Sequence, residues 1–130
     1  MENIKLQKNK RIAVVEDDRD ILDLIEYILT DEGYRIYLYD HIETADKIIA
    51  QQPALLLLDN RLADGYGTTL CSSLKSNPKT KNIPVILLSA SSDIEQLATD
   101  CGADAFLPKP FDLDDLVKLV RHYANGPVLC

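Results

Sequence analysis

The chain has 130 residues, which is enough for one ordinary globular domain but not for two. It carries 14 Lys and Arg against 21 Asp and Glu, a net charge of −7, and only 10 of the basic residues fall within residues 12–130. This acidity argues against direct binding to nucleic acid or to an anionic membrane surface, because both require basic protein surface.

The chain also lacks the segments that direct a protein into or across a membrane. No apolar run approaches the ~20 residues of a membrane helix, and the N-terminal segment has no apolar stretch of the secretory kind. We therefore expect a cytosolic protein with reduced thiols. Cys71 and Cys101 lie in apolar-periodic segments and should be buried, Cys130 is the last residue, and none of the three has metal-site spacing.

The first elements in chain order are a strand, a helix and a second strand. Residues 1–9 are polar, and we expect them to form a loose arm. The apolar run at residues 11–15 predicts a buried strand. Residues 20–32 carry apolar side chains at helical spacing, and Gly33 is a typical stop after such a helix. Residues 34–39 alternate in character and predict the second strand.

A helix and the most apolar strand follow. Asp40 and Glu43 have the spacing of a capping box, which predicts a helix that Pro53 ends. Residues 54–58 form a strand-sized run of apolar side chains that should be fully buried. The polar, glycine-bearing stretch at residues 64–67 then predicts a loop.

The same alternation continues in the second half of the chain. We expect a helix at about residues 68–76 and a fourth strand at residues 85–88. Ser91 or Ser92 can cap the next helix, which should run through Cys101.

The last strand and helix complete the pattern. Gly102 should end the preceding helix, and residues 105–107 predict the fifth strand. Asp112 is the expected cap of a final helix that continues to residue 124. We therefore predict one domain at residues 10–124, followed by a tail at residues 125–130.

Strict alternation of strands and helices predicts the fold class. Parallel strands need helical crossovers and are buried on both faces, which explains the unbroken apolar runs. We expect a single doubly wound α/β domain of the flavodoxin-like kind, with five parallel strands in the order 2-1-3-4-5 and five helices. In such sheets, sites form at the carboxyl ends of the strands, where the strand order reverses between the first and third strands.

Polar residues follow four of the predicted strands at that edge. They are Glu16, Asp17 and Asp18 after the first strand, Asp59 after the third, Ser89 after the fourth and Lys109 after the fifth. Taken singly, Asp17 and Asp18 could only cap a helix and Asp59 could be a turn residue. Taken together, clustered carboxylates favour a divalent ion such as Mg²⁺, which commonly takes one or two carboxylates plus phosphate oxygens.

The chemistry of this set is coherent with phosphoryl transfer. A carboxylate beside Mg²⁺ can attack phosphorus and form an aspartyl phosphate. Lys109 and the ion would stabilise charge on the phosphoryl oxygens, and Ser89 could donate a hydrogen bond to them. Neither histidine falls at a strand end, and no nucleophile elbow surrounds a serine, so the usual parts of a hydrolase are missing from the sequence pattern.

Residues 10–124 resemble the receiver domain of a two-component response regulator, a fold of the CheY-like superfamily. The similarity rests on short motifs at the predicted strand ends. These are Glu16-Asp17-Asp18, Asp59 after four leucines, Ser89-Ala90, Lys109-Pro110-Phe111, and the approach Gly102-Ala103-Asp104-Ala105-Phe106.

The resemblance implies a phosphoacceptor and a metal site. Asp59 would accept a phosphoryl group from a phosphohistidine on a sensor histidine kinase or a phosphotransfer protein. Mg²⁺ would be bound by Asp18, by Asp59 and by the backbone carbonyl of Arg61, while Asp17 would hold it through water. The protein would then be a signalling module rather than an enzyme, although it would assist its own phosphotransfer and dephosphorylation.

The resemblance also implies a switch. Lys109 would pair with the phosphoryl group, and the peptide bond before Pro110 is expected to be cis. Ser89 and the backbone of Ala90 would bind the phosphoryl oxygens, and Phe106 would turn into the space that Ser89 vacates. The surface of the fourth helix, fifth strand and fifth helix would then change, be read by a downstream protein, and allow a phosphorylation-dependent dimer.

The segment after Asp59 departs from the family pattern. The usual Met-Pro pair is Leu62 and Ala63 here, Tyr66 replaces an acid, and Arg61 brings a long basic side chain near the acceptor. We expect a less restrained loop and an altered rate of phosphorylation or hydrolysis. Because no output domain follows residue 124, we expect action by contact, as a stand-alone regulator or as a receiver of a longer chain such as a hybrid kinase.

Two other classes of function remain open at this point. A scaffold of the same fold could act without phosphate, which the loop departures favour. An enzyme or flavin carrier is disfavoured by the sequence: the loop Glu-Asp-Asp-Arg-Asp after the first strand would repel a phosphate group, and an Asp-nucleophile phosphatase would need a second acid where Arg61 stands.

Overall fold

The computed structural model describes residues 10–42 and 45–125, apart from the side chains of residues 45, 46 and 49. The expected arm at residues 1–9, Glu43, and the tail at residues 126–130 with Cys130 lie outside the described residues. The elements are β1 (Arg11–Val15), α2 (Arg19–Asp31), β2 (Arg35–Tyr39), α3 (Ala45–Gln51), β3 (Leu55–Asp59), β4 (Arg61–Leu62), β5 (Gly65–Tyr66), α4 (Gly67–Ser76), β6 (Val85–Ser89), α5 (Ile94–Cys101), β7 (Ala105–Pro108) and α6 (Leu113–Ala124).

Five parallel strands form the central sheet in the order β2-β1-β3-β6-β7. This is the predicted 2-1-3-4-5 order of a doubly wound domain, and the prediction is confirmed. The unbroken apolar runs have the expected cause: β3 lies in the middle of the sheet with helices on both faces, and Leu55, Leu56, Leu57 and Leu58 are all fully buried.

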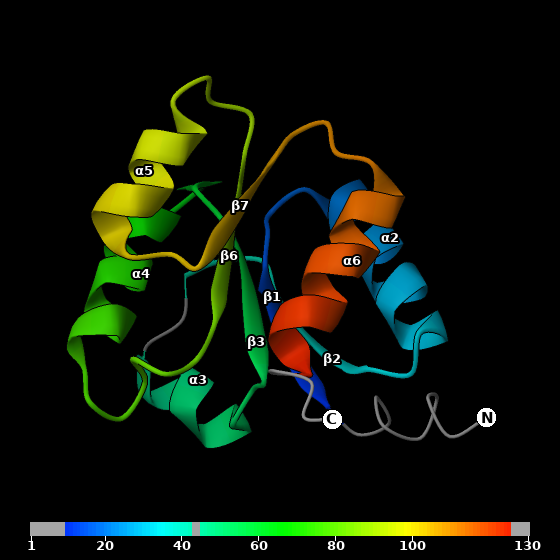
Figure 1. Ribbon diagram of the computed structural model, residues 1–130, viewed down its shortest axis with the longest axis horizontal. Coiled ribbons are helices and arrows are strands. Elements are labelled where there is room, and N and C mark those ends of the chain that lie inside the picture. The colour runs from blue at the N-terminus through cyan, green and yellow to red at the C-terminus, as the bar shows by residue number, and fades with distance from the viewer. Residues whose placement is uncertain (1–9, 43–44, 126–130) are drawn as a thin grey trace.

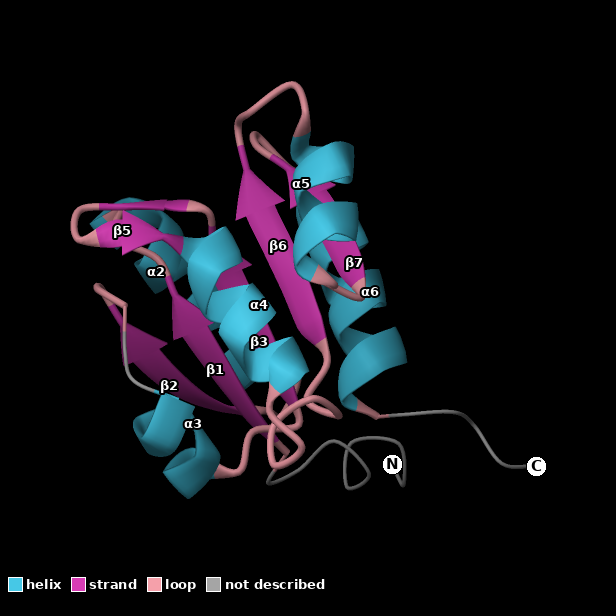
Figure 2. Ribbon diagram, turned by 90° about the vertical axis from the view of Figure 1, so that its left-hand side faces the viewer, coloured by secondary structure: helices cyan, strands magenta, loops and turns pink. Residues whose placement is uncertain are grey.

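Helices cover both faces of the sheet (Figure 1). On one face α2 and α6 pack against Ile12 and Val14 of β1, and on the other face α3, α4 and α5 pack against Ala13 and Val15 (Figure 2). Alternate residues of one strand therefore belong to different cores, as the two-residue period of a strand requires. The expected burial of Cys71 and Cys101 is confirmed, in the core under α4 and α5.

Helix starts follow capping chemistry where the backbone allows it. The carboxylate of Asp112 accepts a hydrogen bond from the backbone N–H of Asp114 at 2.8 Å and caps α6, as predicted. One other start prediction is wrong. Helix α5 begins only at Ile94, after Asp93, rather than with a cap at Ser91 or Ser92.

The capping-box prediction for helix α3 stays a prediction, because residues 43–44 directly before Ala45 lie outside the described residues. The Asp40 carboxylate pairs with Nδ1 of His41 at 2.8 Å.

The expected loop after β3 is a small hairpin. Strands β4 and β5 pair antiparallel, with Arg61 opposite Tyr66 and Leu62 opposite Gly65. Leu62 turns into the core, while Arg61 is exposed. Four residues of the segment thus form a strand pair, and the expected effect of the missing proline on its restraint stays a prediction.

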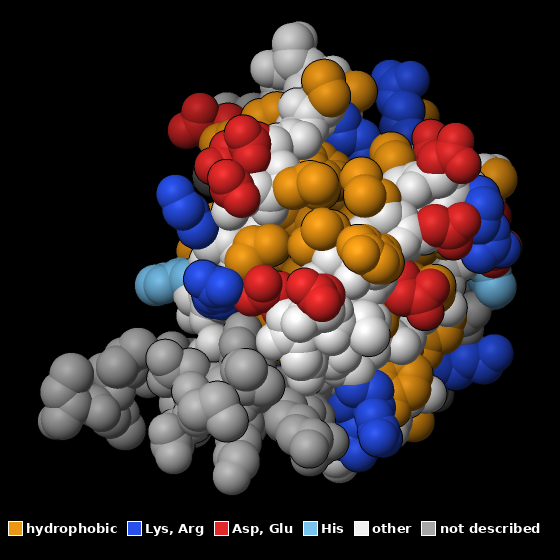
Figure 3. All heavy atoms as spheres, turned by 90° about the vertical axis from the view of Figure 1, so that its right-hand side faces the viewer, with side chains coloured by type: hydrophobic (Ala, Val, Ile, Leu, Met, Phe, Trp, Pro, Cys, Tyr) orange, Lys and Arg blue, Asp and Glu red, His pale blue; other side chains and the backbone are white. Residues whose placement is uncertain are grey.

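The outer face of α2 and α6 keeps an apolar patch between acidic side chains (Figure 3). On α2, Leu24 is 42% and Tyr27 73% exposed, and a shallow groove between the two helices is lined in part by Ile28, Leu113 and Val117. Apolar surface of this kind is typical of protein contact sites. Within the described ranges, no helix combines the length and apolarity needed to span a bilayer.

Candidate functional site

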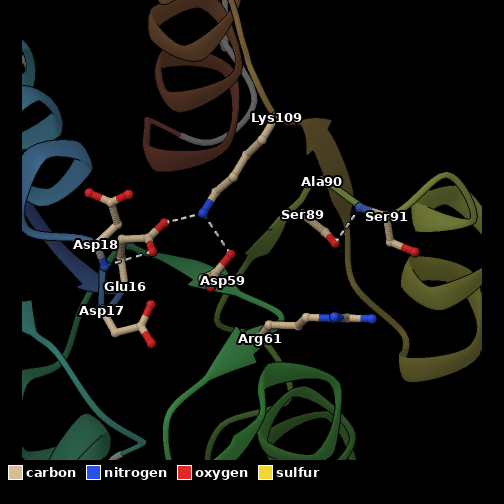
Figure 4. A pocket seen from close by; sticks show the side chains of 9 residues that line it. All are labelled: Glu16, Asp17, Asp18, Asp59, Arg61, Ser89, Ala90, Ser91 and Lys109. Atoms are coloured by element: carbon tan, nitrogen blue, oxygen red, sulfur yellow. Dashed lines mark hydrogen bonds and ion pairs between the residues drawn. The ribbon is translucent and has the colours of Figure 1, made fainter.

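The carboxyl ends of four sheet strands surround one polar pocket of about 420 Å³ (Figure 4). Because parallel strands end at the same edge, residues far apart in sequence meet there. The residues that line the pocket are Glu16, Asp17, Asp18, Asp59, Arg61, Ser89, Ala90, Ser91 and Lys109. All of the polar residues expected at the strand ends are therefore brought together.

Asp59 is the last residue of β3 and lies 5% exposed below the pocket. The four buried leucines before it leave the strand no freedom to shift, so they determine where this carboxylate stands. Gly67, at the start of α4, packs closely against the backbone of Asp59 and Asn60. Its N–H donates to the carbonyl oxygen of Asn60 at 2.7 Å, and a Cβ at this position would lie 2.2 Å from the carbonyl oxygen of Asp59.

Lys109 joins the carboxylates of two different strands. Its backbone N–H donates to the carbonyl oxygen of Ser89 at 2.8 Å, and the peptide bond to Pro110 is cis. The ammonium Nζ lies 2.5 Å from Oε1 of Glu16 and 2.8 Å from Oδ1 of Asp59. Glu16 is fully buried, so this ion pair network is largely closed off from water.

The three groups of this network shift one another's pKa. Burial raises the pKa of the Glu16 and Asp59 carboxyls above their ordinary values, and the hydrogen bonds from Lys109 oppose that rise in both. Burial would lower the pKa of Lys109, but its hydrogen bonds to Asp59 and Glu16 outweigh burial and raise it. Lys109 is thus protonated at neutral pH, where it offsets part of the cost of burying two acids.

The acids that cluster are displaced by one residue from those expected. Ligand oxygens of Glu16, Asp17 and Asp59 all lie within 4.8 Å of one another. Asp18 lines the same pocket, but its carboxylate caps α2 by accepting the backbone N–H groups of Asp20 at 3.0 Å and Ile21 at 3.3 Å. Glu16 and Asp17 therefore share a carboxylate cluster with Asp59, while Asp18 lines the pocket as the cap of α2 and its expected role as a metal ligand stays a prediction.

The side of the pocket formed after β6 carries hydroxyl groups. Ser89 is 3% exposed, and its Oγ accepts the backbone N–H of Ser91 at 3.0 Å. Ala90 lies between them on the pocket wall. Phe106, the expected switch aromatic, is half-buried on β7 opposite Leu87 and packs against the core under α3, α4 and α5, outside the pocket lining.

Sequence reasoning missed three contributors to the site. Glu16 was noted at the strand end without a role, although a charged residue that directly follows a buried strand is a usable signal. The close approach of Gly67 to Asp59 and the β4–β5 hairpin depend on contacts between separate segments, which no local pattern predicts.

Comparison with protein-family models gives the decisive match. The model of the response regulator receiver domain matches residues 12–121. The chain belongs to this family. As a receiver domain it is a signalling domain of two-component systems, the class of module that exchanges signals with histidine kinases and effectors.

Solved receiver structures agree with this assignment. The receiver domain of a signal transduction histidine kinase from Syntrophus aciditrophicus is 30% identical, with a TM-score of 0.81, and the match covers 90% of this receiver and 91% of that chain. A CheY-like receiver domain protein from Methanospirillum hungatei JF-1 is 29% identical, with a TM-score of 0.80 and coverages of 91% and 95%.

A third structure shares the fold at lower identity. The receiver domain of the sensor histidine kinase PA1611 from Pseudomonas aeruginosa PAO1 is 24% identical, with a TM-score of 0.80 and coverages of 91% and 99%. That protein was solved with a magnesium ion coordinated in its active site cleft.

Proposed function

We propose that Asp59 is the phosphoacceptor of this receiver domain and takes its phosphoryl group from a phosphohistidine of a histidine kinase or phosphotransfer protein. The observation that carries the proposal is the Asp59 carboxylate at the floor of the pocket, 2.8 Å from the Lys109 ammonium. Burial raises the pKa of the Asp59 carboxyl, and the hydrogen bond from Lys109 opposes that rise. A nucleophile and a charge-stabilising group are thus already in contact.

The donor set of the pocket fits a hard divalent cation. Three carboxylates with oxygens within 4.8 Å, two of them buried, repel one another unless a cation lies between them. We propose that Glu16, Asp17 and Asp59 hold Mg²⁺, with the backbone carbonyl of Arg61 as a further ligand, and that Asp18 serves the helix cap instead. When bound, the ion would supply charge neutralisation for an incoming phosphoryl group.

The residues of the chain have distinct roles in the transfer. An Asp59 oxygen bonds to phosphorus while the bond from phosphorus to the histidine nitrogen breaks, and the imidazole leaves with the electron pair. Lys109 neutralises charge on the phosphoryl oxygens, and the Ser89 hydroxyl and the Ala90 backbone N–H can donate to them. We propose that the chain is a signalling module and not an enzyme, and that it assists its own phosphotransfer and dephosphorylation.

Phosphorylation of Asp59 is tested directly by mass spectrometry. With Mg²⁺ and a small phosphodonor, the intact protein should gain one phosphoryl group, and Asp59→Asn should gain none because an amide cannot attack phosphorus. Asp115→Asn, an exposed change of the same kind on α6, is the matched control and should behave as the wild type. Equal modification of Asp59→Asn, or no modification of the wild type, contradicts the assignment.

Metal binding is tested by thermal unfolding of paired variants. At a Mg²⁺ concentration about tenfold above the dissociation constant, the wild type should gain about 1.4 kcal/mol of stability. Asp17→Asn should lose most of this gain. Asp18→Asn should keep it, because an asparagine can still cap α2 and Asp18 is not in the carboxylate cluster. If Asp18→Asn lost the gain in stability and Asp17→Asn kept it, the metal ligand would be Asp18 and not Asp17.

The output of the switch is proposed on the surface of α5, β7 and α6. Ser89 connects the pocket to this region, because its carbonyl oxygen accepts the N–H of Lys109 at the end of β7. Movement of Ser89 toward a phosphoryl group would alter the packing around Phe106 on the neighbouring strand. We propose that a downstream protein, or a second copy of the receiver, contacts this surface after phosphorylation.

A further inference from the structure

Two buried cysteines meet between α4 and α5, away from the pocket described above. Cys71 belongs to α4 and is fully buried, and Cys101 is the last residue of α5 and is 5% exposed. Both belong to the core beneath these two helices. Neither is among the residues that line the pocket around Asp59, so the proposed phosphoryl transfer gives them no role.

The two side chains face each other. The thiol of Cys71 donates a hydrogen bond to the backbone carbonyl oxygen of Cys101 at 3.3 Å, and it is also hydrogen-bonded to the Cys101 thiol. Helices α4 and α5 pack directly against each other (Figure 1). Residues 30 positions apart in the chain therefore bring two sulfur atoms within reach of one another, which is the first requirement for a disulfide.

The end of α5 is the more accessible side of this pair. Helix α5 has only eight residues, and the side chain of its N-cap residue, Asp93, makes no capping hydrogen bond with the described backbone of the helix. A short helix without a side-chain cap opens locally at a low cost in free energy. Such opening exposes Cys101 to a small reactant before Cys71, which lies within the longer α4.

We propose that Cys71 and Cys101 are an oxidisable pair that a hydroperoxide converts into a disulfide between α4 and α5. With hydrogen peroxide, the Cys101 sulfur attacks one peroxide oxygen, the O–O bond breaks, and a sulfenic acid and water form. The Cys71 sulfur then bonds to the Cys101 sulfur, and the departing hydroxide takes the Cys71 proton as water. Two thiols and one peroxide thus give one disulfide and two waters, and the peroxide accepts one electron from each sulfur.

The order of the two steps follows from the surroundings of each thiol. Burial raises the pKa of the Cys71 thiol above its ordinary value, and the neighbouring Cys101 thiol adds to that rise. Because the thiolate is the reactive form, Cys71 should react slowly with peroxide from solution. Its position beside Cys101 makes the second step intramolecular, which compensates for a small thiolate fraction.

The bridge would tie the C-terminal end of α5 to α4. Helix α5 starts after β6 at the pocket edge of the sheet and runs back, so Cys101 lies just before β7 at the opposite edge. Amide hydrogen exchange in α5 should therefore slow by about tenfold on oxidation, while the rate of Asp59 phosphorylation should stay within about twofold. Unchanged exchange in the bridged protein would contradict this restraint of α5.

The bridge is tested by a tryptic map of the native protein after exposure to hydrogen peroxide, with free thiols alkylated during denaturation. Trypsin separates the three cysteines: Cys71 falls in the peptide 62–75, Cys101 in 82–118, because the bond before Pro110 resists cleavage, and Cys130 in the last peptide. The linked pair 62–75 with 82–118 should be the main disulfide, two hydrogen atoms lighter than its separate peptides, and a dithiol should release both.

Alanine variants test the order of the steps, since alanine keeps a small apolar side chain in the core. Cys71→Ala and Cys101→Ala should both lose the linked peptide. In Cys71→Ala the remaining Cys101 should be captured by a sulfenic acid trap at least about tenfold more than Cys71 is in Cys101→Ala. Cys130→Ala is the matched control and should leave the yield of the linked peptide unchanged.

The outcomes keep this inference separate from the proposed function of Asp59. A map without the linked peptide, or with Cys130 in most of the disulfides, would overturn the pair. Equal trapping in the two single variants would overturn the order of the steps. Should either variant not fold, the wild-type map decides the pairing alone. A wild type that forms the bridge but accepts no phosphoryl group would refute the role of Asp59 and leave the pair standing.

Discussion

Replacement of Lys109 by methionine should give the largest loss of stability of any single change at the site. Lys109 is the cation between Glu16 and Asp59, whose side chains are 1% and 6% exposed. Removing one partner of a buried ion network leaves uncompensated charge and typically costs about 3–5 kcal/mol. Phosphorylation should also slow by about 10²-fold or more, because charge on the phosphoryl group loses its cation.

The loss of stability in Lys109→Met should depend on pH in a defined direction. Burial raises the pKa of Glu16 and Asp59, so both bind protons more tightly in the folded protein. Each therefore favours the folded state at low pH, and this contribution is lost as pH rises from about 4, the unfolded value, through the folded pKa. Lys109→Met removes the group that opposes these shifts, so its deficit relative to the wild type should grow across that window.

Urea unfolding from pH 4 to pH 8 measures both effects. The double variant Glu16→Gln with Lys109→Met is the control, because it leaves only one acid without its cation, and it should recover a large part of the stability. Lys109 itself contributes stability below its unfolded pKa of about 10.4, which is lost only as pH rises through its raised folded pKa. A Lys109→Met variant as stable as the wild type at every pH would contradict the buried network.

The substitution Gly67→Ala, which adds a single methyl group, should displace Asp59, the proposed phosphoacceptor. The added Cβ would lie 2.2 Å from the carbonyl oxygen of Asp59 and 3.0 Å from Cγ of Leu58. The first neighbour is backbone and cannot rotate away, so β3 or the start of α4 must move. We expect Gly67→Ala to lose about 3 kcal/mol of stability and to phosphorylate at least about tenfold more slowly, because small displacements of a reacting group reduce rates strongly.

Gly102→Ala is the matched control for this prediction. Gly102 ends α5 with φ of 82°, and a Cβ there meets only the side chain of Lys75 at 3.4 Å. Its left-handed backbone should make the alanine cost about 1 kcal/mol, without an effect on the rate of phosphorylation. If Gly67→Ala were phosphorylated at the wild-type rate, the close packing of α4 on Asp59 would have no functional importance.

Local patterns predicted the fold and most of the site because both follow from periodicity. The apolar run Leu55–Leu58 must be buried on both faces, so it is a central parallel strand, and Asp59 after it must lie at the sheet edge. The same reasoning places Ser89 and Lys109 at that edge. The structure brings all three around one pocket.

Local patterns could not decide where two neighbouring acids, or two neighbouring serines, were equally suited by type to cap a helix. Asp17 and Asp18 are equivalent as residue types, and only the first turn of α2 shows that Asp18 caps the helix while Asp17 joins Glu16 and Asp59. Ser91 and Ser92 are good caps by type, yet α5 begins at Ile94. These residues lie just before the helices, where the backbone of the connection decides which of two neighbouring side chains reaches the helix start.

By itself the sequence determined the doubly wound fold, the strand order and the placement of Asp59, Ser89 and Lys109 at one sheet edge, because a two-residue or 3.6-residue period and a strand end are local properties of the chain. Tertiary structure alone decided which acids cluster with Asp59, the hairpin after Asp59 and the placement of Arg61. Each of these depends on contacts across large sequence separations, such as Lys109 with Glu16 or Asp64 with Ile42, and such contacts form only when the folded chain brings the segments together.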